Sequence, residues 1–331
     1  MSGSGRPFIE GGGSQTYPQP YRLEGAHFYG FLLDADPKAL TALCDRYLNP
    51  LARGGVRYHP LIDRVLLGVT DIRRIHIGAR DDRKFWVPEI DVAFWVPVVA
   101  VRRVAGVDVA SRFAWMMTYV VVDDAWAVAA GREVYGLPKA LGVIRRAPPR
   151  TPEPGRPVAL DSLTIDTLAV AKFGPDAQGS VQRLLEVRRR GPAATGLLRT
   201  WSSLRELGEN LVSFVTGSGS GHVRLPGPGL LVEVADYLHH HEYPLVFLKQ
   251  FRDASDGTRA CYQAVVEAPV AITAFRGGGW LDGSYQLRIE PLASHPIVEE
   301  LGLRGPEPPI LAAVHGDFDF ELGAGRVIWE G

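Results

Sequence analysis

The chain has 331 residues, of which 46% are hydrophobic and 22% are charged, as is typical of a globular domain. Its 36 basic and 37 acidic residues leave a formal net charge of -1, which argues against nucleic acid or another polyanion as a partner. The longest apolar run, residues 92–101, is too short to cross a bilayer, and no basic segment with an apolar core opens the chain. We therefore expect neither membrane insertion nor secretion. Only two cysteines are present, Cys44 and Cys261, so a cytoplasmic location is predicted and a disulfide framework is not.

The first half of the chain predicts one helix followed by strands. Residues 1–16 are rich in glycine and serine and predict a flexible tail. Apolar residues at helical spacing predict a helix over residues 36–51, which Asn49-Pro50 ends. Residues 65–69, 91–101 and 113–122 are rich in valine and aromatic residues and predict strands.

The second half predicts helices in the middle and strands at the end. Three glycines and a proline punctuate residues 131–142, which predict a loop or a strand that breaks into a turn and re-forms. A proline-rich connection is expected over residues 147–157, and helical periodicity covers residues 181–190 and 197–215. The remaining predicted strands are residues 244–251, 260–275, 284–291 and 311–320, with a hairpin turn at Asp256-Gly257 between the first two.

These elements predict a single α+β domain over residues 17–331. Strands dominate both ends, so the middle helices, within residues 172–236, are interpreted as an insertion into one mainly antiparallel sheet system. We expect the sheet to be closed or nearly closed, as a barrel or cone.

Lys139 is the strongest candidate for chemistry. The chain has only five lysines, Lys38, Lys84, Lys139, Lys172 and Lys249, and arginine cannot act as an amine nucleophile because its pKa is too high. Pro138 and the nearby glycines constrain the chain around Lys139, and its other neighbours are apolar. Burial would lower the pKa of its amine, and a neutral amine can attack a ketone to form an iminium. The alternative is a lysine whose stem packs on apolar surface while its head reaches water.

Residues 131–142 read Gly-Arg-Glu-Val-Tyr-Gly-Leu-Pro-Lys-Ala-Leu-Gly, which resembles the signature of the acetoacetate decarboxylase family. In that family a Gly-Arg-Glu triplet is followed by Pro-Lys, usually with a second lysine next. The strand over residues 90–98 resembles the one that carries the family's active-site glutamate, and residues 245–320 resemble its second half. The resemblance covers most of the chain except residues 172–236.

The resemblance implies a Schiff-base enzyme with Lys139 as the nucleophile. Asp91 best matches the family's glutamate, and Glu89, two residues away on the same strand face, is the alternative. Ala140 stands where the family often has a second lysine that lowers the pKa of the nucleophile, so desolvation or a distant arginine such as Arg145 must take its place. Ala26 and His27 stand near the position of a family arginine.

Substrate contacts are predicted for Arg132, Tyr135 and His27, although the preferred interpretation of Arg132 and Glu133 is that they brace the loop. The expected reaction is carbon–carbon bond cleavage, by decarboxylation or retro-aldol chemistry, on a β-keto acid or related carbonyl compound. A divergent aldolase or dehydratase on the same fold is one alternative, and a non-catalytic binding protein for a small apolar ligand is another. No metal or organic cofactor is needed, and the family's habit of forming large assemblies implies a homo-oligomer.

Two other sequence runs do not indicate a metal site, a phosphate-binding loop or a serine hydrolase nucleophile. The run His239-His240-His241-Glu242 lacks the spacing that lets histidines converge on one metal ion. The glycine–serine run over residues 217–221 is not followed by Gly-Lys-Ser/Thr, so it does not predict a phosphate-binding loop. The same run does not lie between a strand and a helix, as a serine hydrolase nucleophile would.

Overall fold

The structure is a computed structural model that describes residues 7–9, 11–13, 16–50, 55–77, 85–104, 107–147, 160–191, 200–201, 244–281 and 283–330. Its strands are β1 (Tyr21–Asp34), β2 (Arg57–Pro60), β3 (Arg64–Ile77), β4 (Trp86–Val104), β5 (Val107–Val122), β6 (Lys139–Ala147), β7 (Ser162–Ala169), β8 (Ser180–Arg190), β9 (Thr200–Trp201), β10 (Leu245–Arg252), β11 (Ala260–Ala268), β12 (Val270–Trp280), β13 (Ser284–Ile289), β14 (Ile310–Leu322) and β15 (Arg326–Glu330). Its helices are α1 (Pro37–Tyr47), α2 (Ala125–Ala130), the π-helical turn η1 (Gly131–Tyr135) and α5 (Ile297–Leu301).

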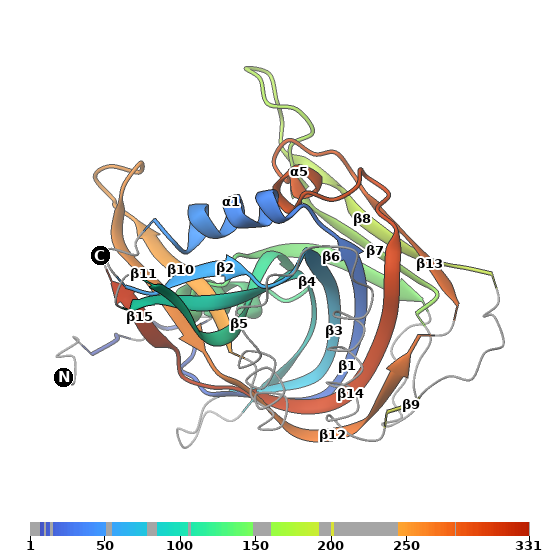
Figure 1. Ribbon diagram of the computed structural model, residues 1–331, viewed down its shortest axis with the longest axis horizontal. Coiled ribbons are helices and arrows are strands. Elements are labelled where there is room, and N and C mark those ends of the chain that lie inside the picture. Colours follow the sequence, from blue (N-terminus) through green and yellow to red (C-terminus); the bar gives the residue numbers. More distant parts are fainter. Residues whose placement is uncertain are drawn as a thin grey trace.

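All strands of the described residues belong to one sheet, whose main path runs β13-β8-β7-β6-β5-β4-β3-β1-β14-β12-β9. The pairing is antiparallel except that β5 pairs in parallel with both β6 and β10. The strands β3, β1, β14 and β12 lie side by side and curve strongly, and α1 lies across the open side of the curve (Figure 1). The prediction of a mainly antiparallel β protein with few helices is therefore confirmed.

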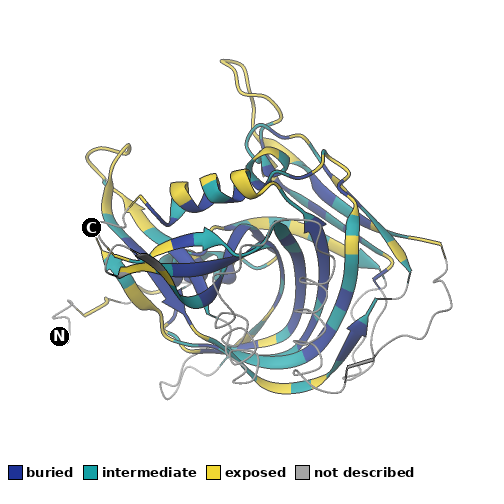
Figure 2. Ribbon diagram, viewed as in Figure 1, coloured by how far each residue is buried: buried dark blue, intermediate teal, exposed yellow. Residues whose placement is uncertain are grey.

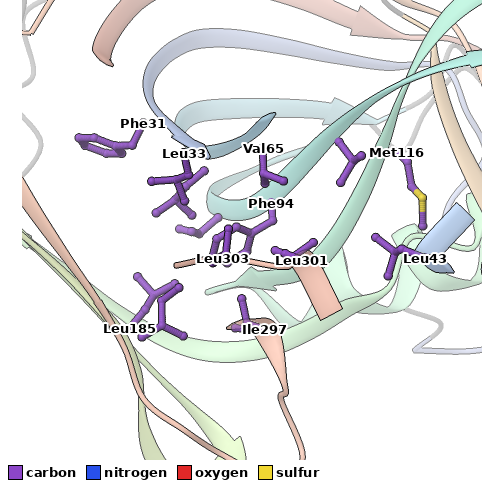
Figure 3. Close-up of a cluster of buried hydrophobic side chains, with 14 of the residues drawn as sticks. Phe31, Leu33, Leu43, Val65, Phe94, Met116, Leu185, Ile297, Leu301 and Leu303 are labelled. Atoms are coloured by element: carbon purple, nitrogen blue, oxygen red, sulfur yellow. The ribbon is translucent and has the colours of Figure 1, made fainter. Parts of the chain in front are cut away.

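The curved sheet holds a large apolar core on its helix-bearing side. The buried side of α1 faces the strands and its other side is exposed (Figure 2). Phe31, Leu33, Val65 and Phe94 from three central strands meet the α5 residue Leu301 in this core (Figure 3). Asp36 caps α1 by accepting a hydrogen bond from Lys38 N, which explains why the predicted helix begins where it does.

A second apolar cluster lies around the start of β6 and contains the aromatic residues Tyr21 and Tyr135 together with Met117, Leu137 and Phe247. This cluster surrounds the lysine loop, so the loop is part of a packed region. Among the described residues no helix is long and apolar enough to cross a membrane.

The predicted helix over residues 181–190 is wrong, because the segment forms strand β8 between β7 and β13. A register shift opposite Ile165 and Asp166 leaves Leu184 as an extra residue, and both Leu184 and Leu185 are buried. The two adjacent buried leucines break the strand alternation, and together with Val181, which is exposed, their spacing in the sequence imitates a helix face. At least this part of the predicted insertion is thus integral to the sheet.

Other predictions need smaller corrections or cannot be assessed. The predicted strand over residues 260–275 is two strands, β11 and β12, separated at Pro269. The turn at Asp256-Gly257 is confirmed between β10 and β11. The runs at residues 217–221 and 239–242 lie outside the described residues. So do most of the predicted connection over residues 147–157 and of the predicted helix over residues 197–215.

Gly136→Ala is expected to lower the free energy of unfolding by about 2–4 kcal/mol, the sum of a left-handed backbone and an overpacked contact. Gly136 has φ +84°, and an added Cβ would lie 2.4 Å from Lys249 Cα. Urea denaturation measures the change. Gly174→Ala is the control, because an added Cβ there meets nothing within 4 Å. Equal unfolding midpoints for the two variants would contradict the predicted packing of the loop.

Candidate active site

Lys139 is the first residue of β6 and pairs in parallel with Val120 of β5. Ahead of it, η1 ends at Gly136, whose left-handed conformation turns the chain back, and Leu137 N donates to Gly131 O at 3.0 Å. The expected break and re-forming of a strand is therefore a short helical turn followed by β6. The constrained turn therefore places Lys139 at the start of β6.

Gly131 leaves room for the lysine side chain. A Cβ at Gly131 would lie 2.8 Å from Lys139 Cδ and 3.2 Å from Lys139 Cε. Any side chain at this position would displace the amine. This close approach gives a physical reason for the first glycine of the motif.

Two carboxylates of β4 face the amine. Glu89 and Asp91 are two residues apart on the strand and so point to the same face. Lys139 Nζ donates a hydrogen bond to Glu89 Oε1 at 2.6 Å and lies 3.8 Å from Asp91 Oδ2. Asp123, at the end of β5, holds this part of β4 in place by accepting a hydrogen bond from Ile90 N at 2.7 Å. The structure therefore brings both candidate acids to Lys139, where the sequence left open which of them belongs to the site.

The three charged groups are shielded from solvent, with residue exposures of 8% for Lys139, 3% for Glu89 and 8% for Asp91. Burial lowers the pKa of Lys139, but the charges of Glu89 and Asp91 and the hydrogen bond to Glu89 outweigh it, so the pKa is raised. The expectation of a lowered pKa is thus wrong, because the sequence did not show that two acids would surround the amine. Burial raises the pKa of Asp91 to about 7, against the opposing charge of Lys139.

These groups line a cavity of about 100 Å³. Its other walls are mostly aromatic and aliphatic and include Tyr17, Tyr21, Leu23, Ile72, Ile75, Val87, Trp95, Met117, Leu137, Leu245, Val270, Phe320 and Leu322. A second cavity, of about 1160 Å³, shares Met117, Leu137 and Lys139 with the first and extends toward the β10–β11 hairpin. Such an apolar cavity around a few converging polar groups is typical of a small-molecule site.

His27 is not brought to Lys139. It pairs with Asp71 of β3, whereas the neighbouring cavity residues of β3 are Thr70 and Ile72. Because side chains alternate along a strand, His27 and Asp71 point to the other face of the sheet. There His27 Nδ1 lies 3.7 Å from Asp317 Oδ2. The predicted substrate contact of His27 does not match this geometry.

The remaining predicted contacts also lie outside the small cavity. Arg132 lines the larger cavity, and its Nη1 donates to Lys139 O at 3.3 Å, which fits the loop-bracing interpretation. Tyr135 is fully buried, donates to Gly323 O at 2.8 Å and packs edge-on against Tyr21. Arg145 is exposed and pairs with Asp166, so it does not replace the family's second lysine.

The aromatic wall of the cavity was not predicted from the sequence. Trp95 continues the alternation of Glu89 and Asp91 along β4, so this position could have been found from the strand pattern. Tyr17 and Tyr21 gave no such signal, because they enter the cavity from the segment that follows the predicted tail. Tyr17 packs on Trp126 at a centroid distance of 5.7 Å.

Stability is expected to fall as the pH rises from about 4 to 7, on account of Asp91. Since its pKa is raised from 3.8 to about 7 in the folded state, the folded chain holds more protons than the unfolded chain in this window. Asp91→Asn removes the carboxyl group and with it this pH dependence. The free energy of unfolding of the wild type, relative to that of the variant, should therefore drop by on the order of 2–4 kcal/mol between pH 4 and pH 8. Urea denaturation of both proteins at each pH measures it. A constant difference would show that Asp91 ionises normally.

No family model matches the chain, and no curated protein does. Among solved structures, the chain is similar to acetoacetate decarboxylase from Legionella pneumophila subsp. pneumophila str. Philadelphia 1, with a TM-score of 0.54 and 17% identity over 100% of this chain and 94% of that one. A second acetoacetate decarboxylase structure gives a TM-score of 0.52 and 14% identity over 96% of this chain and 92% of the other.

A third similar structure is that of the enduracididine biosynthesis enzyme MppR, with a TM-score of 0.51 and 13% identity over 99% of this chain and 98% of that one. Another structure of MppR holds the condensation product of pyruvate and imidazole 4-carboxaldehyde. The matches extend over nearly the whole length of each chain, whereas the resemblance seen in the sequence left out residues 172–236. The chain therefore has the acetoacetate decarboxylase fold.

Proposed function

We propose that this protein is a Schiff-base-forming lyase that cleaves a carbon–carbon bond in a β-keto acid or related carbonyl compound. The observation that carries the proposal is the contact of Lys139 Nζ with Glu89 at 2.6 Å and with Asp91 at 3.8 Å at the wall of an apolar cavity. A buried lysine beside a proton acceptor has the two parts that imine formation requires, a nucleophile and a base.

Glu89 is proposed to prepare the nucleophile. In the unliganded site Lys139 is held as an ammonium group by the two carboxylates, which raise its pKa. A substrate that fills the cavity excludes water, and in a less polar environment a neutral amine and carboxylic acid become favourable relative to the ion pair. The proton can then move across the 2.6 Å hydrogen bond from Lys139 to Glu89.

The neutral amine attacks the carbonyl carbon, and loss of water with a proton supplied by Glu89 gives the iminium. The electron pair of the breaking carbon–carbon bond moves into the iminium and forms an enamine, while carbon dioxide or an aldehyde departs. Protonation of the enamine carbon, followed by hydrolysis, releases a ketone and restores Lys139. Asp91, whose pKa of about 7 lets it hold or release a proton near neutrality, is proposed to move the proton at carbon.

Aldol addition or dehydration on the same enamine is the second candidate. It is favoured by the lack of a second cation: no described residue that lines the small cavity is an arginine or a second lysine. Ala140, not a lysine, follows the nucleophile in the chain. A decarboxylase of this fold would be expected to hold a carboxylate substrate with such a cation. A small carbonyl compound is the proposed partner in either case, and a cytoplasmic homo-oligomer remains our proposal for location and assembly.

Product analysis tests the proposed function. The protein is incubated with acetoacetate and, separately, with 4-hydroxybutan-2-one, and release of carbon dioxide or formaldehyde is followed. Either product, formed catalytically by the wild type and lost in Lys139→Met, supports the lyase. Tight binding of these ketones without turnover, unaffected by Lys139→Met, would instead support a binding protein.

A further inference from the structure

The charges that line the small cavity set a condition on its ligand. Among the described residues that line it, Lys139 is the only basic side chain, and Glu89 and Asp91 are the only carboxyl groups. The cavity thus offers two acids and one amine. This amine is the group that must react.

The proton transfer that activates the amine removes the positive charge of Lys139, while the net charge of the cavity stays the same because the proton remains on Glu89. The amine has to lose its proton before it can attack a carbonyl carbon, and the receiving group is Glu89 at 2.6 Å. At that moment the part of the lining that the structure describes carries no positive charge, while Asp91 Oδ2 lies 3.8 Å from the reacting nitrogen. A substrate carboxylate one or two bonds from the carbonyl would lie beside Asp91 in a poorly solvated space and have no cation to pair with.

Two cations of the described residues near the lysine loop, Arg132 and Lys249, are engaged elsewhere. Arg132 donates to the carbonyl oxygen of Lys139 and lines the larger cavity, not the smaller one. Lys249 Nζ donates to Val134 O at 3.1 Å and lies over the ring of Phe251. Neither residue lines the small cavity.

The walls and size of the cavity select for a small, largely apolar molecule. Tyr17, Trp95, Met117 and Phe320 offer carbon surface to most of the ligand. A dry protein cavity of about 150 Å³ is large enough for benzene, so about 100 Å³ suits a ligand of roughly four to six non-hydrogen atoms.

We infer that the site takes an uncharged aldehyde or ketone, such as a β-hydroxy ketone, in preference to a keto acid. The inference rests on the proposed Schiff-base function and narrows its substrate class. With a β-hydroxy ketone, a base takes the hydroxyl proton, and the carbon–carbon electron pair moves into the iminium as the aldehyde leaves. The enamine then gains a proton at carbon and is hydrolysed to the ketone, so the substrate gives one aldehyde and one ketone.

Two methyl ketones of similar size test the inference. 4-Hydroxybutan-2-one and acetoacetate share the unit CH3–CO–CH2 and differ in carrying a hydroxymethyl group or a carboxylate. The initial rate of borohydride trapping on Lys139 is measured for each by peptide mass spectrometry and normalised to trapping of the same ketone on butylamine. We expect the uncharged ketone to be trapped faster by about tenfold or more, since close like charges interact strongly in a poorly solvated site.

Asp91→Asn gives a second readout that a structural role alone would not produce. Removal of this carboxylate should raise the trapping rate of acetoacetate relative to that of 4-hydroxybutan-2-one, so the ratio of the two rates should fall. The effect should be larger at pH 8 than at pH 5. Thermal unfolding of the variant confirms that it is folded, and the wild-type ratio stands independently if it is not.

The outcomes separate the two proposals. Trapping of acetoacetate on Lys139 as fast as, or faster than, 4-hydroxybutan-2-one overturns the preference for uncharged substrates and leaves the Schiff-base function intact. Absence of any Lys139 adduct with either ketone, and also with butan-2-one and pyruvate, overturns both. A preference for the uncharged ketone that Asp91→Asn narrows supports the inference.

Discussion

Lys139→Met is expected to lower kcat for carbon–carbon cleavage by on the order of 10⁴-fold or more, the scale of loss when a covalent nucleophile is removed. Lys139 supplies the only amine among the described residues that line the small cavity. Methionine keeps the length and apolar character of the side chain but cannot form an imine. Steady-state kinetics with the best substrate of the panel measures the loss.

The structure also predicts that this variant folds. The substitution would leave Glu89 without its hydrogen-bond partner, but a buried acid without a counter-charge can take up a proton and become neutral. Lys172→Met is the matched control, because Lys172 is exposed. If Lys139→Met kept more than about a tenth of the wild-type kcat while remaining pure and folded, covalent catalysis through Lys139 would be excluded.

Glu89→Gln is expected to make the amine of Lys139 more reactive at neutral pH and at the same time to lower kcat. Glutamine removes the charge that most strongly opposes the effect of burial on Lys139, so the pKa of the amine should fall. At neutral pH the amine should therefore react faster with a small acylating reagent. Turnover should nevertheless drop by about 10²–10⁴-fold, because the group that takes and returns the proton is gone.

Two measurements on the same variant test this split. The pH dependence of Lys139 acylation, read by peptide mass spectrometry, should shift to lower pH in Glu89→Gln, while kcat falls. Glu307→Gln serves as the control, since Glu307 lies at the surface, 3.4 Å from Arg288. An upward shift, or no loss of kcat, would mean that Glu89 does not serve as the base.

Strands could be predicted from the sequence where their local hydrophobic pattern is not altered by pairing with a neighbouring strand. The strands β4 and β5 are long, valine-rich and buried, and both were expected. Strand β8 was mistaken for a helix because the bulge at Leu184 buries two adjacent leucines, so the strand lacks the alternating pattern. Such a bulge depends on the neighbouring strand β7, which local spacing does not reveal.

The candidate site could be predicted in part for similar reasons. Lys139 was indicated by Pro138 and the glycines around it together with the family resemblance, and Glu89 and Asp91 by their shared strand face. The sequence could not show that both acids would approach one amine, so the raised pKa of Lys139 was missed. The predicted substrate contact of His27 does not fit the structure, because which face of β1 meets the cavity depends on its register with β3, which the sequence does not show.

The central claim is that the amine of Lys139 forms an imine with a carbonyl substrate. The most direct test is to incubate the protein with 4-hydroxybutan-2-one, acetoacetate, butan-2-one or pyruvate, add borohydride and map the mass increase by peptide mass spectrometry. The account predicts a reduced adduct on Lys139, blocked by Lys139→Met and unchanged by Lys172→Met. An adduct confined to Lys38 or Lys84, or none with any of the four compounds, would contradict it.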